Sequence, residues 1–230
     1  MKIYKGILNF SLIFIFLVII FKKDSIFFDI GGVLINIYPE KCLEYWADCS
    51  DIPLQVIKKA FSQEAHTLYE TGKLSEHSFF LAFQNALPQS YFFTESNFWY
   101  GWQQILGEET PVVQVLKHLS DQYNIWLLSN TNPEHIRTVL KRQVSYLDFV
   151  DGNIYSFDAG ASKPNASIFE FALKHSCANA FESVFIDDLI ENVKAAKTLG
   201  FNAIHYENVN QLIKELDKKG IKVSEMEVSA

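Results

Sequence analysis

The 230-residue sequence has few cysteines, no clustered stripe of basic residues, no internal repeat and no low-complexity linker. A formal net charge of −7 and a pI of about 5.4 argue against nucleic acid as a partner, because such proteins concentrate positive charge on one face. The three cysteines, Cys42, Cys49 and Cys177, cannot all pair with one another. They favour buried free thiols in a reducing, cytoplasmic compartment over a disulfide framework.

An apolar run, Ile7 to Phe21, lies near the N-terminus with lysines on both flanks. It is shorter than the roughly 18–20 residues that span a bilayer comfortably, and no small-residue cleavage site follows it. Three interpretations of residues 1–23 stay open: a membrane anchor that tethers a cytoplasmic protein, an N-terminus extended by the choice of start site, and a cleaved signal peptide. A shorter product would need a start codon other than Met, because no second methionine precedes Met226.

Residues 38–107 predict a helical insert. Four helices are expected there with no strand among them, in Glu40–Ala47, in Leu54–Phe61, after Ser75, and from Phe98 to Ile105. Helices that follow one another without strands form a small bundle more readily than part of a sheet. The insert is therefore predicted to be a cap that acts as a lid.

The rest of the chain alternates strands with helices. Thr110 and Pro111 open a helix that runs to about Gln122. Strands are expected at Ile125–Leu128, Ile154–Phe157, Ser183–Ile186 and Asn202–His205, with helices opened by Asn132, Asn165 and Leu189. Right-handed β-α-β crossovers then give a doubly wound, mostly parallel, Rossmann-like α/β core, made of residues 24–37 and 108–230.

Polar residues end several of the predicted strands. Asp29 follows the apolar run SIFF and enters a glycine pair, Ser129 ends WLLS, and Asp187 and Asp188 end VFIDD. The carboxyl ends of parallel strands are where open α/β sheets assemble their ligand sites. Lys163, in GASKPN, stands between the second and third of these positions along the chain. The ordered set predicts an active site.

The carboxylates suggest the chemistry of phosphoryl transfer. A carboxylate on a tight glycine turn, such as Asp29, can attack a phosphorus in line and form an acyl phosphate. An anionic nucleophile that attacks an anionic phosphate needs positive charge nearby. Asp29 and Asp188 could recruit that charge as Mg²⁺, with Asp187 assisting or orienting the shell.

Other residues fit the same chemistry. Lys163 would neutralise the transferring oxygens, while Ser129 and the backbone N–H groups that follow it would hold the phosphate. Asn192, one helical turn after Asp188, could form a hydrogen bond with an acidic side chain. Each residue alone has an ordinary explanation as a cap or a turn, and only their combination is specific.

The combination resembles the haloacid dehalogenase-like hydrolase superfamily from Ser25 to Tyr206. FFDIGGVL, LLSNTN, the Lys163-Pro164 step, and FIDD with Asn192 are similar to the four motifs of that superfamily, and the insert occupies the position of its alpha-helical cap. The greatest likeness is to small sugar-phosphate phosphatases and to the N-terminal phosphatase domain of soluble epoxide hydrolases. The resemblance implies a Mg²⁺-dependent phosphatase that acts on a small phosphorylated metabolite through an aspartyl-phosphate.

The resemblance also implies roles for individual residues. It makes Asp29 the nucleophile. The implied magnesium ligands are Asp29, Asp188 and the backbone carbonyl of Gly31, with Asp187 beside them. The implied phosphate-binding residues are Ser129, Asn130 and Lys163.

One position departs from the pattern. Most phosphatases of this superfamily carry a second aspartate two residues after the nucleophile, as acid for the leaving group and base for water, and Gly31 stands there in this chain. The absence of such an acid costs on the order of 10² to 10⁴ in rate when the leaving alkoxide is basic. The sequence therefore predicts a preference for anomeric or otherwise activated phosphates, such as a sugar 1-phosphate.

Two other functions remain open. A 2-haloacid dehalogenase uses the aspartate nucleophile without a metal, but Asp187 and Asp188 would repel an anionic haloacid unless a cation lay between them. A non-catalytic binding or regulatory module is the other alternative, against which the intact set of Asp29, Lys163 and Asp188 argues. The sequence leaves the oligomeric state and the substrate undetermined.

Three residues with aromatic rings in the predicted cap could contact the substrate. His66, Tyr69 and Trp102 are candidates for substrate contacts, but the core of a helical bundle is the commoner place for aromatic side chains, so they are not assigned. The other histidines, His135 among them, show no metal-ligand spacing and are interpreted as surface or core residues.

Overall fold

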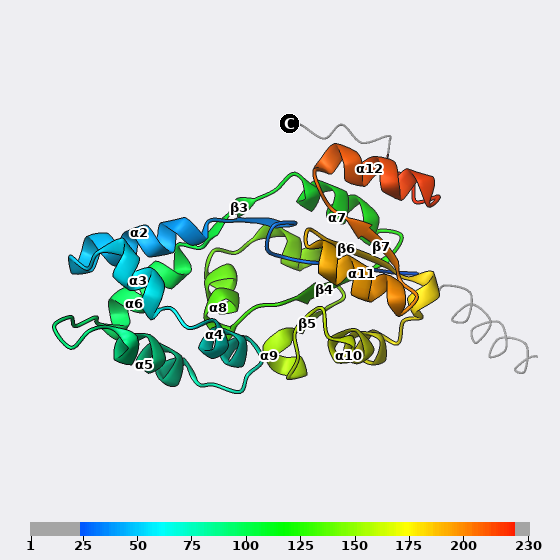
Figure 1. Cartoon of the computed structure of the whole chain (residues 1–230). Coiled ribbons are helices and arrows are strands. Elements are labelled where there is room, and N and C mark those ends of the chain that lie inside the picture. The colour runs from blue at the N-terminus through cyan, green and yellow to red at the C-terminus, as the bar shows by residue number, and fades with distance from the viewer. Residues whose placement is uncertain (1–23, 224–230) are drawn as a thin grey trace, which may run out of the picture.

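A computed structural model of the chain describes residues 24–223 (Figure 1). The apolar run Ile7 to Phe21, one interpretation of which is a membrane anchor, lies outside these residues. Within residues 24–223, no helix combines the length and the apolar character that crossing a membrane requires.

Five parallel strands form the central sheet. They are β1 (Ser25–Phe28), β4 (Asn124–Ser129), β5 (Gly152–Tyr155), β6 (Val184–Asp187) and β7 (Asn202–His205), in the order β5-β4-β1-β6-β7. In the central strand, Phe27 pairs with Trp126 on one side and with Phe185 on the other. The predicted doubly wound α/β fold is confirmed.

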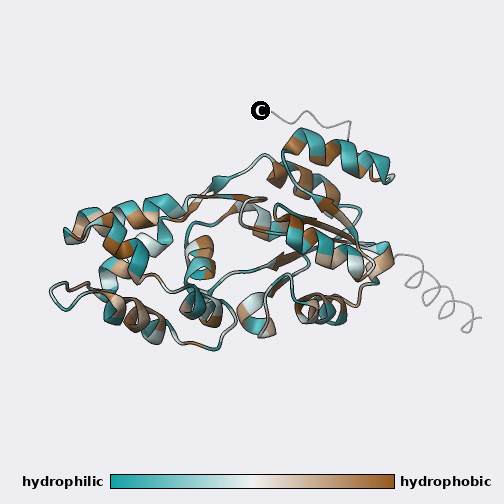
Figure 2. Cartoon of the chain, in the orientation of Figure 1, coloured by the Kyte–Doolittle hydropathy of each residue, from teal (hydrophilic) through white to brown (hydrophobic). Residues whose placement is uncertain are grey.

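Helices cover both faces of this sheet. On one face α7 (Val112–Ser120) and α12 (Val209–Lys218) pack on Ile26 and Phe28. On the other, α10 (Ala166–Ser176) and α11 (Ile190–Thr198) pack on Phe27. Since a strand alternates its side chains between the two faces, β1 is buried throughout and reads as a continuous apolar run. Figure 2 shows the strands at the centre of the sheet largely in brown, the colour of hydrophobic residues.

The predicted insert contains five helices, one more than the sequence analysis expected. They are α2 (Pro39–Ser50), α3 (Leu54–Ala60), α4 (Gln63–Glu70), α5 (Glu76–Ala86) and α6 (Glu95–Gln103). The missed helix, α4, is short and mostly polar, and it begins where the Ser62 hydroxyl accepts a hydrogen bond from the Ala65 N–H (3.1 Å). The five helices share their own aromatic core, in which Trp46 stacks on Phe98 with ring centroids 4.7 Å apart.

A two-stranded ribbon joins the insert to the sheet. Strand β2 (Ile35–Ile37) pairs in antiparallel fashion with β3 (Leu106–Glu109) where the chain leaves and re-enters the core. Neither strand is expected from the sequence, because each is very short and its partner lies about 70 residues away. The helix predicted after Thr110 and Pro111 is present, and the Thr110 hydroxyl accepts a hydrogen bond from the Val112 N–H (3.2 Å).

The remaining elements connect these layers. They are α8 (Pro133–Lys141), α9 (Ser156–Ala159) and two 3₁₀ turns, Ser145–Phe149 and Ala180–Glu182. The strand predicted to run to Phe157 ends at Tyr155, because Ser156 begins α9.

The three cysteines are free, and the expectation that they are buried holds for one of them. Cys42 is buried in the cap, but Cys49 and Cys177 are exposed. Cys49 lies in the last turn of α2 and Cys177 at the left-handed end of α10, where the chain turns away from the packed core.

Candidate active site

The strand order brings the predicted residues together. Because β1 lies between β4 and β6, Asp29 follows its strand between Ser129 and Asp187. A hydrogen bond from the Asp29 N–H to the Ile186 carbonyl (2.9 Å) continues the pairing past the end of β1. One carboxylate oxygen from each of Asp29, Asp187 and Asp188 lies within 4.8 Å of the others. Residues about 160 apart in sequence thus share one site.

Lys163 reaches this site from the loop before α10. Its ammonium nitrogen lies 3.0 Å from Asp29 Oδ1 and 2.6 Å from Asp187 Oδ2, and it donates a hydrogen bond to the Leu128 carbonyl (2.8 Å). The Lys163 side chain is fully buried. Burial acts to lower the pKa of Lys163, but the two neighbouring carboxylates outweigh it and raise the pKa above its ordinary value. The side chain is therefore a permanent cation.

The Asn130 side chain holds the loop that carries Lys163. Its Oδ1 accepts a hydrogen bond from the Lys163 N–H (2.7 Å), and its Nδ2 donates one to the Lys163 carbonyl (2.9 Å). Both polar ends of the amide are thus occupied by protein. A hydrogen bond from Asn130 to a bound anion would come from its backbone N–H, just before the N-terminus of α8, or from the second N–H of its Nδ2.

Asp29 is a buried carboxylate in an unusual electrostatic environment. Burial raises its pKa to about 7, with Lys163 opposing and Asp187 reinforcing the rise. Its Oδ1 accepts a hydrogen bond from the Ile30 N–H (2.7 Å). A cation bound beside Asp29 would favour the ionised, nucleophilic form.

Asp187 and Asp188 are neighbours in sequence but differ in their surroundings. Asp187 is fully buried, and its oxygens accept hydrogen bonds from Lys163, from the Leu189 N–H (2.8 Å) and from Asn192 Nδ2 (3.0 and 3.1 Å). Asp188 Oδ1 is buried yet has no hydrogen-bond partner among residues 24–223. Burial, with Asp187 next to it, raises the pKa of Asp188. A buried carboxylate oxygen without a partner suits a metal ion.

Gly32 makes room for Asp188. Its φ of +77° is in the left-handed region, and a Cβ at this position would lie 2.4 Å from Asp188 Oδ2. Gly31 has no such constraint: a Cβ there would lie 3.4 Å from Ile37 Cγ2 and within reach of nothing closer. The second glycine of the pair is required by the carboxylate, whereas the first tolerates a side chain.

The residues present fit a magnesium ion. Asp29 and Asp188 offer hard carboxylate oxygens, and Gly31 lines the same cavity. Asp187, whose oxygens are engaged by Lys163 and Asn192, is better placed to position Lys163 than to bind metal.

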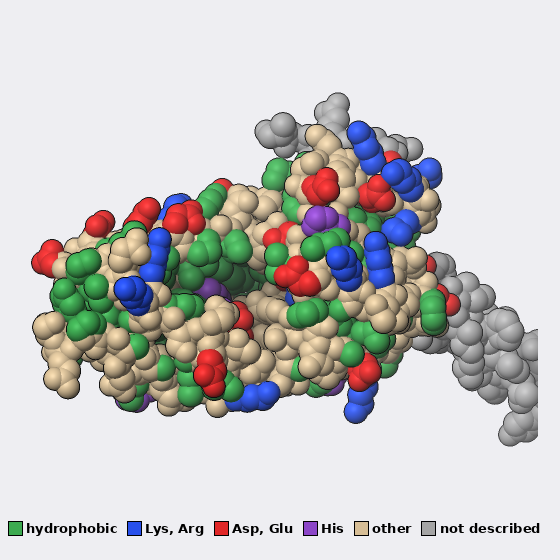
Figure 3. Space-filling view, in the orientation of Figure 1, with side chains coloured by type: hydrophobic (Ala, Val, Ile, Leu, Met, Phe, Trp, Pro, Cys, Tyr) green, Lys and Arg blue, Asp and Glu red, His purple; other side chains and the backbone are tan. Residues whose placement is uncertain are grey.

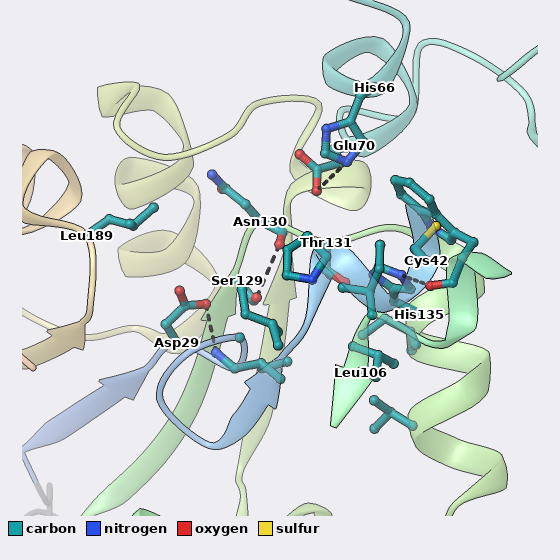
Figure 4. Close-up of a pocket in the computed structure, with 18 of the residues that line it drawn as sticks. Asp29, Cys42, His66, Glu70, Leu106, Ser129, Asn130, Thr131, His135 and Leu189 are labelled. Atoms are coloured by element: carbon teal, nitrogen blue, oxygen red, sulfur yellow. Dashed lines mark hydrogen bonds and ion pairs between the residues drawn. The ribbon is translucent and has the colours of Figure 1, made fainter. Parts of the chain in front are cut away.

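Asp29, Gly31 and Asp188 form the floor of a cavity of about 420 Å³ between the sheet and the cap. Figure 3 shows the molecule hollowed between its two lobes, with hydrophobic side chains beside the hollow. Asp29, Ser129, Asn130 and Thr131 lie on one side of the cavity in Figure 4, and His66 and Glu70 project from α4 on the other. Most of the cap wall is apolar, with Leu43, Trp46, Phe61, Trp102 and Ile105.

The cap residues that the sequence left unassigned divide into two groups. His66 and Trp102 line the cavity, whereas Tyr69 is buried in the cap core, stacked on Phe79 at 4.8 Å. His135, interpreted from the sequence as a surface or core residue, is half-buried on α8 and also lines the cavity. No local pattern distinguishes these residues, because the cavity is formed by segments distant in sequence.

Two further residues of the site, Ser156 and Gly32, were not assigned a role from the sequence. The buried Ser156 hydroxyl accepts a hydrogen bond from the Thr131 N–H (3.0 Å) and donates one to the Thr131 carbonyl (3.0 Å), which fixes the turn after β4. Gly32 was seen only as half of a glycine pair. In both cases the sequence shows the residue but does not indicate which distant residue it contacts.

Comparisons with known proteins agree with this geometry. A family model described as haloacid dehalogenase-like hydrolase matches residues 23–200. The D-ribitol-5-phosphate phosphatase of Bacteroides thetaiotaomicron is 27% identical over 195 residues, which are 80% of this chain and 92% of that protein. The sesquiterpene phosphatase astK of Aspergillus oryzae is 25% identical over 183 residues, 77% and 87% of the two chains.

Solved structures share the fold. A HAD family enzyme from Bacteroides thetaiotaomicron, in complex with magnesium and inorganic phosphate, superposes with a TM-score of 0.72 at 24% identity, over 81% of this chain and 95% of that one. A predicted HAD-like hydrolase from Porphyromonas gingivalis gives a TM-score of 0.73 at 24% identity, over 87% and 99% of the two chains.

Proposed function

The chain belongs to the haloacid dehalogenase-like hydrolase family, and we propose that it is a magnesium-dependent phosphatase of small phosphorylated metabolites. One observation carries this proposal: the buried Lys163 ammonium lies beside Asp29, and the nearby Asp188 has a buried oxygen with no hydrogen-bond partner within residues 24–223. That arrangement provides a carboxylate nucleophile, a fixed cation and a place for a second cation at one point. The two phosphatases named above, among the relatives of this chain, support it.

The proposed reaction has two steps. An Asp29 carboxylate oxygen attacks phosphorus, the bond from phosphorus to the leaving oxygen breaks, and the electron pair departs on that oxygen. Water then hydrolyses the resulting aspartyl-phosphate, which releases inorganic phosphate and restores Asp29. Lys163 offsets the negative charge of the transferring oxygens, and Ser129 with the backbone N–H groups before α8 orients them.

Asp29, Asp188 and the Gly31 carbonyl are the proposed magnesium ligands. When bound, Mg²⁺ would supply positive charge that keeps Asp29 ionised and draws a phosphate oxygen into the site. Asp187, supported by Asn192, would keep Lys163 aimed at Asp29.

Gly31 supports a narrower proposal about the substrate. No carboxylate stands at that position to protonate the leaving group, so we propose that the substrate carries an activated leaving group, as sugar 1-phosphates and aryl phosphates do. The two phosphatase relatives act on very different alcohols, a polyol and a sesquiterpene, so likeness to them does not choose the substrate.

Phosphate release by the full-length chain, with Mg²⁺ or with EDTA, tests the proposal. Release that requires Mg²⁺ and disappears in Asp29→Asn is expected. The matched control is Asp24→Asn, an exposed carboxylate just before the same strand, which should release phosphate at the wild-type rate. Chloride release from a 2-haloacid without phosphate release would instead support a dehalogenase, and neither product would support a non-catalytic role.

A further inference from the structure

We propose that the leaving group of the substrate is an aromatic alcohol, so that the chain prefers aryl phosphates, the phosphomonoesters of phenols, to phosphorylated sugars and polyols. The inference rests on the proposed phosphatase activity and adds the chemical class of its substrate. Two independent features carry it: the composition of the cavity wall opposite Asp29, and the glycine at position 31.

The wall opposite the carboxylates is hydrophobic. It is formed by Leu43 and Trp46 of α2, Phe61 after α3, Trp102 of α6 and Ile105. The rings of Phe61 and Trp102 are close to parallel, 23° apart with centroids separated by 6.0 Å. At about 420 Å³ the cavity lies near the lower end of the usual range for ligand sites, about 300–1,000 Å³, which suits a phosphate with a small ring system.

The polar atoms of the aromatic wall residues already have partners. Trp46 Nε1 donates to the Phe98 carbonyl (3.0 Å), and Trp102 Nε1 donates to Asn132 Oδ1 (3.3 Å). His135 has Nε2 beside the Trp102 carbonyl (3.1 Å) and Nδ1 beside Asn132 Nδ2 (3.1 Å), so both ring nitrogens are engaged. These three side chains can offer a ligand only their ring surfaces.

The remaining polar side chains of the cap wall, Gln63, His66 and Glu70, are partly paired with one another. His66 Nε2 lies 3.3 Å from Glu70 Oε1, and His66 Nδ1 lies 3.5 Å from Gln63 Nε2. The hydroxyls of a sugar would therefore find few partners there, and each buried hydroxyl left unpaired costs about 1–3 kcal/mol. An aromatic ring instead gains favourable ring contacts on the same wall.

The glycine at position 31 selects for the same class independently of the wall. When the bond from Asp29 to phosphorus forms, the bond from phosphorus to the leaving oxygen breaks and the electron pair leaves on that oxygen. A phenol has a pKa of about 10, as the tyrosine side chain illustrates, so phenolate departs without a proton and takes one from water afterwards. An aliphatic alkoxide is far more basic and would need the acid that Gly31 lacks.

Four substrates test the effect of the apolar wall and the effect of Gly31 separately. Phenyl phosphate is apolar and activated, cyclohexyl phosphate apolar and not activated, glucose 1-phosphate polar and activated, and ribitol 5-phosphate polar and not activated. With the full chain and Mg²⁺, we expect kcat/KM for phenyl phosphate to exceed that for glucose 1-phosphate at least tenfold. We expect kcat for phenyl phosphate to exceed that for cyclohexyl phosphate by about 10² or more.

Two variants test which feature of the site produces the expected substrate preference. Leu43→Gln places an amide on the wall and should raise KM for phenyl phosphate several-fold with little change for glucose 1-phosphate. Its matched control is Leu140→Gln on the outer side of α8, where the leucine is 57% exposed and does not line the cavity. Gly31→Asp, at a position where an added Cβ would meet nothing closer than Ile37 at 3.4 Å, should shrink the phenyl to cyclohexyl ratio of kcat at least tenfold.

The outcomes distinguish this inference from the proposed function. Mg²⁺-dependent release that is as fast from glucose 1-phosphate or ribitol 5-phosphate as from phenyl phosphate overturns the aromatic leaving group and leaves the phosphatase standing. Equal kcat for the phenyl and cyclohexyl esters overturns the argument from Gly31. No release from any of the four overturns the phosphatase itself, and the inference with it.

Discussion

The ammonium of Lys163 and the carboxylate of Asp187 form an ion pair of 2.6 Å in which neither side chain is exposed to solvent. Asn192 and the Leu189 N–H complete the hydrogen bonding of the carboxylate. Asp29 lies on the other side of the same ammonium, at 3.0 Å. The two aspartates compete for one cation, and Asp187, with more hydrogen bonds, fixes where that cation lies.

Replacing Asp187 with asparagine should destabilise the fold. Removal of one partner from a buried pair costs about 3–5 kcal/mol in free energy of unfolding, and Asp29, 3.0 Å from the same ammonium, offsets part of this loss. Urea unfolding measures the loss. Asp188→Asn is the matched control, because its Oδ1 has no partner within residues 24–223, so its unfolding free energy should stay near wild type while Mg²⁺-dependent turnover is lost. Equal destabilisation by the two variants would contradict the different roles proposed for the two aspartates.

The two glycines after Asp29 should respond oppositely to alanine. Gly32→Ala places a Cβ 2.4 Å from the Asp188 carboxylate and on a left-handed backbone, so the apparent affinity for Mg²⁺ should fall at least tenfold. Gly31→Ala places its Cβ at ordinary contact distance from Ile37 and should leave that affinity within about twofold of wild type. Titrating phosphate release against Mg²⁺ for both variants gives the comparison, and similar losses would show that the spacing to Asp188 is unimportant.

His135 should make the stability of the fold depend on pH. Burial lowers its pKa to about 4 from an ordinary 6.5, so between these values the unfolded chain binds a proton that the folded chain does not. Stability should therefore fall as pH drops from about 6.5 to 4, by about 3 kcal/mol from this residue. Urea unfolding from pH 4 to 8 measures the slope. In His135→Gln the slope should be reduced across this window, and an unchanged slope would assign it to other groups.

The cap should be held on the core more by buried contacts than by its exposed ion pair. Arg137 of α8 lies 2.7 Å from Glu76 of α5, but both side chains are more than 40% exposed, so Glu76→Ala, which leaves the pair of Arg137 with the buried Glu134 intact, should cost less than about 1 kcal/mol. Asn132 is fully buried, caps α8 through the His135 N–H (3.0 Å) and accepts from Trp102. Asn132→Ala should cost about 1–3 kcal/mol of unfolding free energy. The reverse ranking in urea unfolding would contradict this account of the cap.

Local sequence patterns were sufficient to predict much of the α/β core. The SIFF run, the capping residues Asn132 and Asn165, and the strand Asn202–His205 are all found where their residue types predict them. Burial on both faces makes a parallel strand continuously apolar, and a cap acts within one helical turn, so both are visible in a short window of sequence. Helix α4 and the ribbon of β2 and β3 were not predicted from the sequence, because their stabilising contacts come from distant segments.

By itself, the sequence determined which chemical groups end the strands: Asp29, Ser129, Asp187 and Asp188, with Lys163 before α10 and a glycine where an acid is expected. Only the tertiary structure decided how they are used. The order β4-β1-β6 places Asp29 between Ser129 and Asp187. Lys163 forms its ion pair with Asp187 and not with Asp188, which gives the two neighbouring aspartates different surroundings. The cap covers the site with a largely apolar and aromatic wall. The physical reason is that strand composition follows from local burial, whereas the pairing of charges and the lining of a cavity depend on which distant segments pack together.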